Sequence, residues 1–228
     1  MRYLHEIGFK GFDCSKKSLN IITSWGQPVK RQPVKKQVTG LKKIEADMQN
    51  CSLCRLSASG GKFLFGTGNP DADLMLIGGM PSGPDNTSLD NNKPDDLFAG
   101  KAGELLEKII NAINLTKDDV YFCNIIKCST PGERVPKQDE INTCAPFMEQ
   151  QINAVKPLFI CALGETAIEF FLKTGKPVSA LRGRVYNYKG IKLLPTYHPA
   201  DLLRDQSKKR DVWEDMKMLM RKMKRGSN

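Results

Sequence analysis

Asp73-Leu74-Met75-Leu76-Ile77-Gly78 is a short, almost wholly apolar run that ends in glycine. Two later runs, residues 120–126 and residues 158–163, have a similar length and character. Apolar runs without polar alternation are typical of strands buried on both faces, and such strands occur mainly in parallel sheets covered by helices. The three runs therefore predict an α/β fold.

The segments between and after these runs carry apolar residues at helical spacing. We expect helices over residues 39–49, 103–113, 138–155, 164–171 and 208–223. Residues 185–188 and 191–196 should form a hairpin around Lys189-Gly190. Strands that alternate with helices predict a three-layer α/β/α sandwich with a central, mostly parallel four-stranded sheet.

Functional sites in sheets of this kind lie outside the carboxyl ends of the strands. Polar or glycine-rich segments follow three of the predicted strands, at residues 78–86, 124–128 and 196–204. We therefore expect the side chains of these three segments to lie near one another and to form the site.

Cys51-Ser52-Leu53-Cys54 places two thiols within reach of one metal centre, and Cys128 and Cys144 could complete a set of four. Four cysteines hold either a structural zinc ion or an iron–sulfur cluster. Because Cys128 follows a predicted strand and Cys144 lies in a predicted helix, the set would join distant segments. Four ordinary buried thiols are the plain alternative, since free cysteine is among the most buried residue types. Spacing favours a metal for Cys51 and Cys54 and leaves the other two open.

The formal charge of +10 is concentrated at the two ends of the chain. Residues 1–37 carry eight Lys/Arg against two Asp/Glu, and residues 204–228 carry nine against four. Such ends attract a polyanion, most simply nucleic acid, or serve only as solubilising tails. Prolines and basic residues at 27–36 are typical of an extended linker. We therefore divide the chain into a basic N-terminal extension, residues 1–37, and an α/β domain, residues 38–228.

The sequence shows neither a membrane span nor a secretory signal, since no apolar run is long enough for a span and the first residues lack an apolar stretch. The seven cysteines form an odd set, which favours reduced thiols or metal ligands over a disulfide framework. We expect a cytoplasmic protein that works as a monomer.

Six short motifs occur in one order along the chain, although each is weak alone. They are Cys51-x-x-Cys54, Gly78-Gly79-Met80-Pro81, Leu97-Phe98-Ala99-Gly100-Lys101-Ala102-Gly103, Asn124-Ile125-Ile126-Lys127-Cys128 with Pro131-Gly132-Glu133-Arg134-Val135-Pro136, Cys144, and Pro195-Thr196-Tyr197-His198-Pro199-Ala200-Asp201-Leu202-Leu203-Arg204. Together they resemble the family 4, thermostable-type iron–sulfur uracil-DNA glycosylases of the uracil-DNA glycosylase superfamily. The resemblance covers residues 38–223. It implies a DNA-repair hydrolase that cleaves the N-glycosidic bond of uracil in DNA and leaves an abasic site for base-excision repair.

The resemblance also implies a cofactor and a partner. The family's four cysteines hold a 4Fe–4S cluster, and they match Cys51, Cys54, Cys128 and Cys144. The expected partner is DNA that contains uracil.

A base inside a duplex must be flipped into a pocket before its glycosidic bond can be attacked. Gly79 and Met80 are expected to line that pocket, and Phe98 to stack on the base. The Asn124 amide matches the O4/N3 edge of uracil and mismatches cytosine. His198 is the expected catalytic donor to uracil O2 as negative charge builds there. The plain alternatives are a core aromatic for Phe98, a local cap for Asn124 and a structural histidine for His198.

Five further residues are expected at the DNA. Gly100 and Lys101 open a helix where backbone amides can approach a phosphate. Leu202 and Leu203 would wedge into the vacated base stack, or else lie in the core, and Arg204 would contact a phosphate.

One motif departs from the family pattern. Where the family usually reads Gly-Glu-Ala-Pro-Gly, this chain has Gly78-Gly79-Met80-Pro81-Ser82, so no carboxylate stands at Gly79. We expect Asp85 to supply the missing acid by positioning water or excluding thymine. The departure leaves an alternative open, a catalytically weak or inactive iron–sulfur DNA-binding protein that is an accessory to replication or repair proteins.

Overall fold

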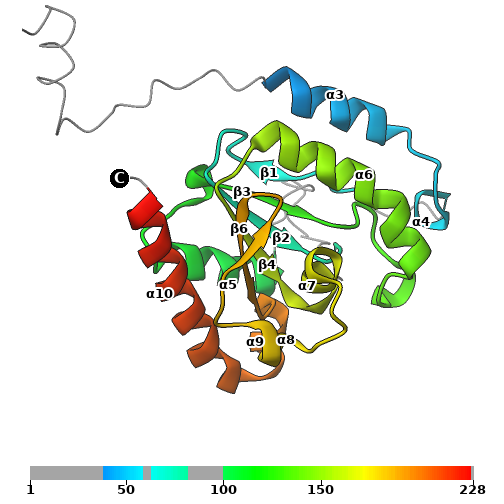
Figure 1. Ribbon diagram of the computed structural model, residues 1–228. Coiled ribbons are helices and arrows are strands. Elements are labelled where there is room, and N and C mark those ends of the chain that lie inside the picture. The colour runs from blue at the N-terminus through cyan, green and yellow to red at the C-terminus, as the bar shows by residue number, and fades with distance from the viewer. Residues whose placement is uncertain (1–37, 59–62, 82–99, 227–228) are drawn as a thin grey trace, which may run out of the picture. The chain divides into compact units, whose positions relative to one another are not determined.

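A computed structural model describes residues 38–58, 63–81 and 100–226, and its centre is a sheet in the order β1-β3-β2-β4-β6-β5 (Figure 1). The strands are β1 Thr67–Gly68, β2 Leu74–Gly78, β3 Val120–Asn124, β4 Phe159–Leu163, β5 Tyr186–Tyr188 and β6 Ile191–Thr196. Strands β3, β2, β4 and β6 are parallel to one another, whereas β1 and β5 pair antiparallel at the two edges. The predicted α/β class and mostly parallel sheet are confirmed.

The prediction of four strands is wrong, because the sheet has six. The four parallel strands form its centre, and the short β1 and β5 extend it on either side. Strand β1 has only two residues, too few to show any periodicity in the sequence. Strand β5 is only partly buried, so its sequence predicts one arm of a hairpin and not a strand of a buried sheet.

Helices cover both faces of the sheet, so the predicted three-layer sandwich is confirmed. One face is covered by α3 Val38–Gln49, α6 Gln138–Val155, α7 Gly164–Leu172 and α8 Val178–Leu181, and the other by α5 Gly100–Asn111, α9 Pro199–Arg204 and α10 Lys209–Gly226. The short helix α4 Arg55–Ala58 follows the first cysteine pair. Within β2, Met75 and Ile77 pack toward α6 and α7, whereas Leu74 and Leu76 pack toward α5 and α10. Every residue of β2 is buried, which explains why its sequence shows no polar alternation.

The carboxyl end of β2 lies where the connections of the sheet diverge. The chain leaves β2 for β3 on one side, and then crosses to β4 on the other side. Ligand sites in open α/β sheets form at such switch points. Two further backbone bonds, from Ile125 N–H to the Gly78 carbonyl and from Ile126 N–H to the Gly79 carbonyl, each 2.9 Å long, hold the ends of β2 and β3 together.

Among the helices in the described part of the chain, none combines the length and apolar character needed to cross a membrane.

Candidate active site at the carboxyl ends of the strands

Asn124 is the last residue of β3, and its side chain is almost completely buried. Its Oδ1 atom has no hydrogen-bond partner among the described residues. A buried carbonyl oxygen without a partner costs roughly 1–3 kcal/mol, so such an atom is a candidate to receive a ligand's hydrogen bond. Gly78 faces this oxygen across the sheet, and a Cβ atom at Gly78 would collide with it. Glycine at this position therefore leaves room for the Asn124 amide.

His198 follows β6 and is the N-cap residue of α9. Its ring Nδ1 accepts a hydrogen bond from Ala200 N–H at 3.2 Å, while its backbone N–H donates to Asp201 Oδ2 at 3.2 Å. Because Nδ1 is an acceptor, the proton of the neutral ring is on Nε2. Nε2 lies 3.7 Å from the position that a Cβ atom of Gly78 would take, so this donor faces the same space as the Asn124 amide.

Burial lowers the pKa of His198 below its ordinary value of 6.5. The nearby Arg204 lowers the pKa further, whereas Asp201 opposes the shift. The imidazole is therefore neutral at neutral pH. The site thus offers a neutral N–H donor on one side and an amide on the other.

Gly79 and Met80, both predicted to line the pocket, lie against different neighbours. A Cβ atom at Gly79 would come within 2.7 Å of Thr166 Cβ, so Thr166 occupies the space beside the missing carboxylate. Met80 Sδ lies 3.3 Å from Thr130 Oγ1 and packs against the core on the α6 side. Thr166 was not predicted; its position in Gly164-Glu165-Thr166, directly after a buried strand, is the signal that could have identified it.

The residues predicted to contact DNA differ in exposure. Helix α5 begins at Gly100, which has φ +75°, and Lys101 beside it is exposed. Leu202 is only 2% exposed and lies in the core with α5 and α10, whereas Leu203 is 44% exposed. Arg204 is exposed and lies 3.8 Å from Asp201. Of the two leucines, Leu203 is therefore the one that can reach a partner.

Phe98 and Asp85, the predicted stacking residue and the predicted acid, lie outside the described residues.

The four predicted metal ligands come from three segments of the chain. Cys51 N–H bonds the Met48 carbonyl at the end of α3, and the carbonyl of Cys54 accepts a bond from Ser57 Oγ. Cys128 pairs with Phe63 in an isolated β-bridge, and Cys144 lies in α6.

The four thiols lie within electrostatic range of one another. Burial, followed by the nearby Cys144, Cys54 and Cys51, raises the pKa of Cys128 to about 11. Burial likewise raises the pKa of Cys144, with Cys54 and Cys51 again adding to the shift. Within the described residues, no three His, Cys, Asp or Glu side chains are close enough to hold a single metal ion. Four cysteine thiols are the donor set of a structural zinc ion or of an iron–sulfur cluster.

Two buried charged residues that the sequence did not identify fix the ends of β3 and β6. The Lys127 side chain is fully buried, and its Nζ donates to the backbone carbonyl of Asn124 at 2.5 Å. Asp215 in α10 is also fully buried, and its carboxylate accepts bonds from Thr196 Oγ1 at 2.7 Å and from Arg182 Nε at 3.0 Å. Thr196 ends β6, two residues before His198.

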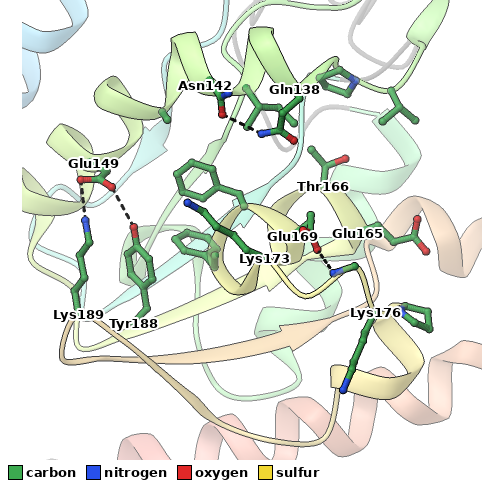
Figure 2. Close-up of a pocket in the computed structure, with 18 residues that line it drawn as sticks. Gln138, Asn142, Glu149, Glu165, Thr166, Glu169, Lys173, Lys176, Tyr188 and Lys189 are labelled. Carbon is green, nitrogen blue, oxygen red and sulfur yellow. Dashed lines mark hydrogen bonds and ion pairs between the residues drawn. The ribbon is translucent and has the colours of Figure 1, made fainter.

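A groove of about 1100 Å³ runs between α6 and α7 toward β5 (Figure 2). Figure 2 shows Glu149 at one end, bonded to Lys189 and Tyr188, and Gln138 bonded to Asn142 elsewhere along the wall. None of the described residues predicted for the site lines this groove. Thr166 lines this groove and also contacts the space beside Gly79.

Comparison with known proteins covers the segments that carry Asn124, Gly78 and His198. The sequence profile of the Uracil DNA glycosylase superfamily matches residues 65–217, which include all three of these residues. The chain belongs to the uracil DNA glycosylase superfamily. The predicted resemblance is confirmed.

Several members of this superfamily are similar over most of the chain. The type-4 uracil-DNA glycosylase of Thermotoga maritima is 34% identical over 178 residues, which cover 76% of this chain and 89% of that protein. The type-4 enzyme of Sulfurisphaera tokodaii is 32% identical over 188 residues, covering 78% and 83%. The type-4 enzyme of Saccharolobus solfataricus is 33% identical over 183 residues, covering 76% and 82%.

Proposed function

We propose that this protein is a DNA-repair glycosylase that flips uracil out of DNA and hydrolyses its N-glycosidic bond. The observation that carries the proposal is the pairing of the unpartnered Asn124 amide oxygen with the neutral His198 donor around Gly78. The type-4 relatives, named as uracil-DNA glycosylases, support it. The protein would act as a monomer inside the cell, wherever its DNA is.

Base recognition follows from the hydrogen-bonding groups of Asn124. Uracil presents an N3–H donor beside an O4 acceptor, and these match the Oδ1 acceptor and the Nδ2 donor of one amide. Cytosine presents an N3 acceptor beside an amino donor, which would leave the same amide mismatched. Because Oδ1 is buried without a described partner, uracil satisfies it and cytosine does not. Phe98 would stack on the flipped base.

Bond cleavage requires a group that stabilises the leaving base. When the bond between C1′ and N1 breaks, its electron pair goes to the base, and negative charge develops on O2. The Nε2–H of His198 would donate to O2 at this point, in the manner of an oxyanion hole. Water adds to C1′, and the proton that it loses passes through solvent to the uracil anion, which leaves an abasic sugar and free uracil. Since His198 is neutral, it donates a hydrogen bond without first having to bind a proton.

The attacking water also needs a carboxylate nearby. Gly79 carries no carboxylate, and Thr166 lies beside it. We assign the role to Asp85, which would position water or exclude the methyl group of thymine. If Asp85→Ala retained the full rate and the selectivity for uracil, this assignment would be wrong.

The cysteines Cys51, Cys54, Cys128 and Cys144 would hold a 4Fe–4S cluster. The mutual electrostatic influence of their thiols supports this set. When bound, the cluster supplies a structural cross-link, because the reaction involves no change of oxidation state. Through Cys128 it would fix the loop that follows Asn124.

Contacts with DNA would come from the exposed residues at two helices. Gly100 and Lys101 would approach phosphates at the start of α5, and Arg204 would contact a phosphate from α9. Leu203 would occupy the space vacated by the flipped base, whereas Leu202 supports it from the core.

An oligonucleotide that carries a single uracil tests the proposed function directly. The full-length protein is incubated with labelled single- and double-stranded DNA, and alkali then cleaves any abasic site. We expect strand scission at the uracil and none in the matched oligonucleotide with cytosine. No scission at a large excess of protein would reject the enzyme in favour of a DNA-binding accessory protein.

A further inference from the structure

Lys127 is the feature that the proposed reaction does not explain. It has the largest side chain among the fully buried residues of the described chain. Lysine is almost never fully buried without a partner, because removing an ammonium group from water costs several kcal/mol even after relaxation. The full burial of Lys127 therefore requires compensating contacts.

The contacts of Lys127 point in two directions. Toward the site, its Nζ donates to the backbone carbonyl of Asn124 at 2.5 Å, and Asn124 is the residue that would read the base. Toward the cysteines, its backbone N–H bonds the thiol of Cys144, and the next residue is Cys128. Its own carbonyl accepts a bond from Leu64 N–H at 2.8 Å. One residue therefore touches both the base-reading end of β3 and the cysteine set.

The charge of Lys127 has no carboxylate partner among the described residues. The thiols of Cys123 and Cys144 lie close to its ammonium group. A cluster held by four thiolates carries negative charge, and this would give the buried ammonium the counter-charge that its surroundings otherwise lack.

We propose that Lys127 is a positioning residue that couples the iron–sulfur cluster to uracil recognition. Its ammonium group balances the charge of the cluster and holds the Asn124 carbonyl, while its backbone N–H holds Cys144. The cluster thus sets the position of the amide that reads the base. This inference rests on the proposed function and on the proposed cluster.

The test compares Lys127→Met with the wild-type protein, both with their clusters bound. Methionine fills most of the space of the buried lysine and removes its charge and its bond to the Asn124 carbonyl, and we expect this volume-conserving variant to fold. Lys192→Met is the matched control, because Lys192 lies in the same sheet but its side chain is exposed over Phe159.

Two readouts separate positioning from a merely structural role. The first is the reduction potential of the cluster, which should become more negative in Lys127→Met, because removing a nearby cation disfavours the reduced state. The second is the Kd for DNA that carries a non-hydrolysable 2′-fluoro uracil nucleotide, which should weaken about tenfold, since a misplaced amide loses its hydrogen bonds to the base. Lys192→Met should change neither quantity.

The outcomes are distinct. If the potential is unchanged, or if the Kd stays within twofold of the wild type, the inference is overturned. If Lys127→Met does not retain its iron, the reduction potential is measured on Lys127→Gln instead. The glutamine amide keeps a hydrogen-bond donor but carries no charge. A more negative potential in Lys127→Gln supports the inference, and an unchanged potential overturns it. The proposed function fails separately, if the wild type itself neither contains iron nor excises uracil.

Discussion

Two strand ends face each other across Gly78, and they are held by different means. The end of β3, with Asn124, is fixed from within by the fully buried Lys127 and leads to Cys128. The end of β6, with His198, is fixed by a helix cap and by the fully buried Asp215, which bonds Thr196 and pairs with Arg182. One end depends on the cysteine segment, and the other depends on α10. The two ends can therefore be perturbed separately, with base reading assigned to β3 and leaving-group stabilisation to β6.

The largest effect should come from His198→Asn. Asparagine is a good N-cap residue and can still accept the bond from Ala200 N–H, so α9 should keep its start. Its amide is too short to reach where the Nε2 donor lies. Loss of a single donor of this kind costs about 10²–10³ in kcat. Single-turnover excision of uracil would measure the rate, and a loss of less than tenfold would contradict the role of His198.

Gly78→Ala should lower kcat/KM about 10²-fold by displacing Asn124 at the end of β3. This is the loss expected when catalytic groups are displaced by about 1 Å. The new methyl group would meet the Asn124 Oδ1 atom, which cannot move easily because it is buried. Binding of uracil should suffer more than the chemistry, in contrast to His198→Asn.

Gly40→Ala provides the control for this substitution. Gly40 lies in α3, where an added Cβ atom would only touch Ala154 at 3.7 Å. Alanine is a better helix former than glycine, so this variant should keep full activity. Equal losses in the two variants would show that the space beside Asn124 is not critical.

The contrast between the two ends also shows what the sequence could reveal. The four parallel strands, the helices and the class of fold were predictable, because buried runs such as residues 74–78 and the periodic helix α6 carry strong patterns. His198 and Asn124 could be proposed for the site because they belong to short motifs. No role was predicted for Lys127, although it lies in the same motif as Asn124, or for Asp215, since lysine and aspartate normally lie at the surface, and only the packing of distant segments shows that these two are buried. The same limit applies to Thr166, whose contact with Gly79 joins residues that are far apart in the chain.

Asp215→Asn should mainly affect stability. It removes the buried acceptor of Arg182 and of Thr196, while Arg182 keeps Asp211, so we expect a loss of about 1–3 kcal/mol. Asp211→Asn is a matched control, because Asp211 pairs with the same Arg182 at 3.3 Å but is 44% exposed. An exposed pair contributes only about 0–1 kcal/mol.

Urea unfolding of both variants measures the difference between these two carboxylates. We expect a large fall in the free energy of unfolding for Asp215→Asn and little change for Asp211→Asn. Excision at low temperature should fall less in Asp215→Asn than in His198→Asn. Similar stabilities in the two variants would mean that α10 does not fix the end of β6 in the way described.

The smallest expected effect concerns the pH dependence of the excision rate, whose fall on the acid side should lie at a lower pH than for an ordinary histidine. Burial lowers the pKa of His198 below 6.5, so the working neutral imidazole should persist below the pH at which an ordinary histidine becomes charged. The excision rate of the wild type should therefore be level above pH 6.5 and fall only below it. The sign for stability is the same: the unfolded chain binds the proton more readily, so the stability that depends on neutral His198 is complete above pH 6.5 and is lost as the pH falls. His198→Asn should lack this limb of the rate profile, whereas Gly78→Ala should keep it, because the group that gives rise to the limb is His198 at the β6 end. A rate that rises as the pH falls through this range would show that the histidine works in its charged form, and the comparison between the two strand ends would need to be redrawn.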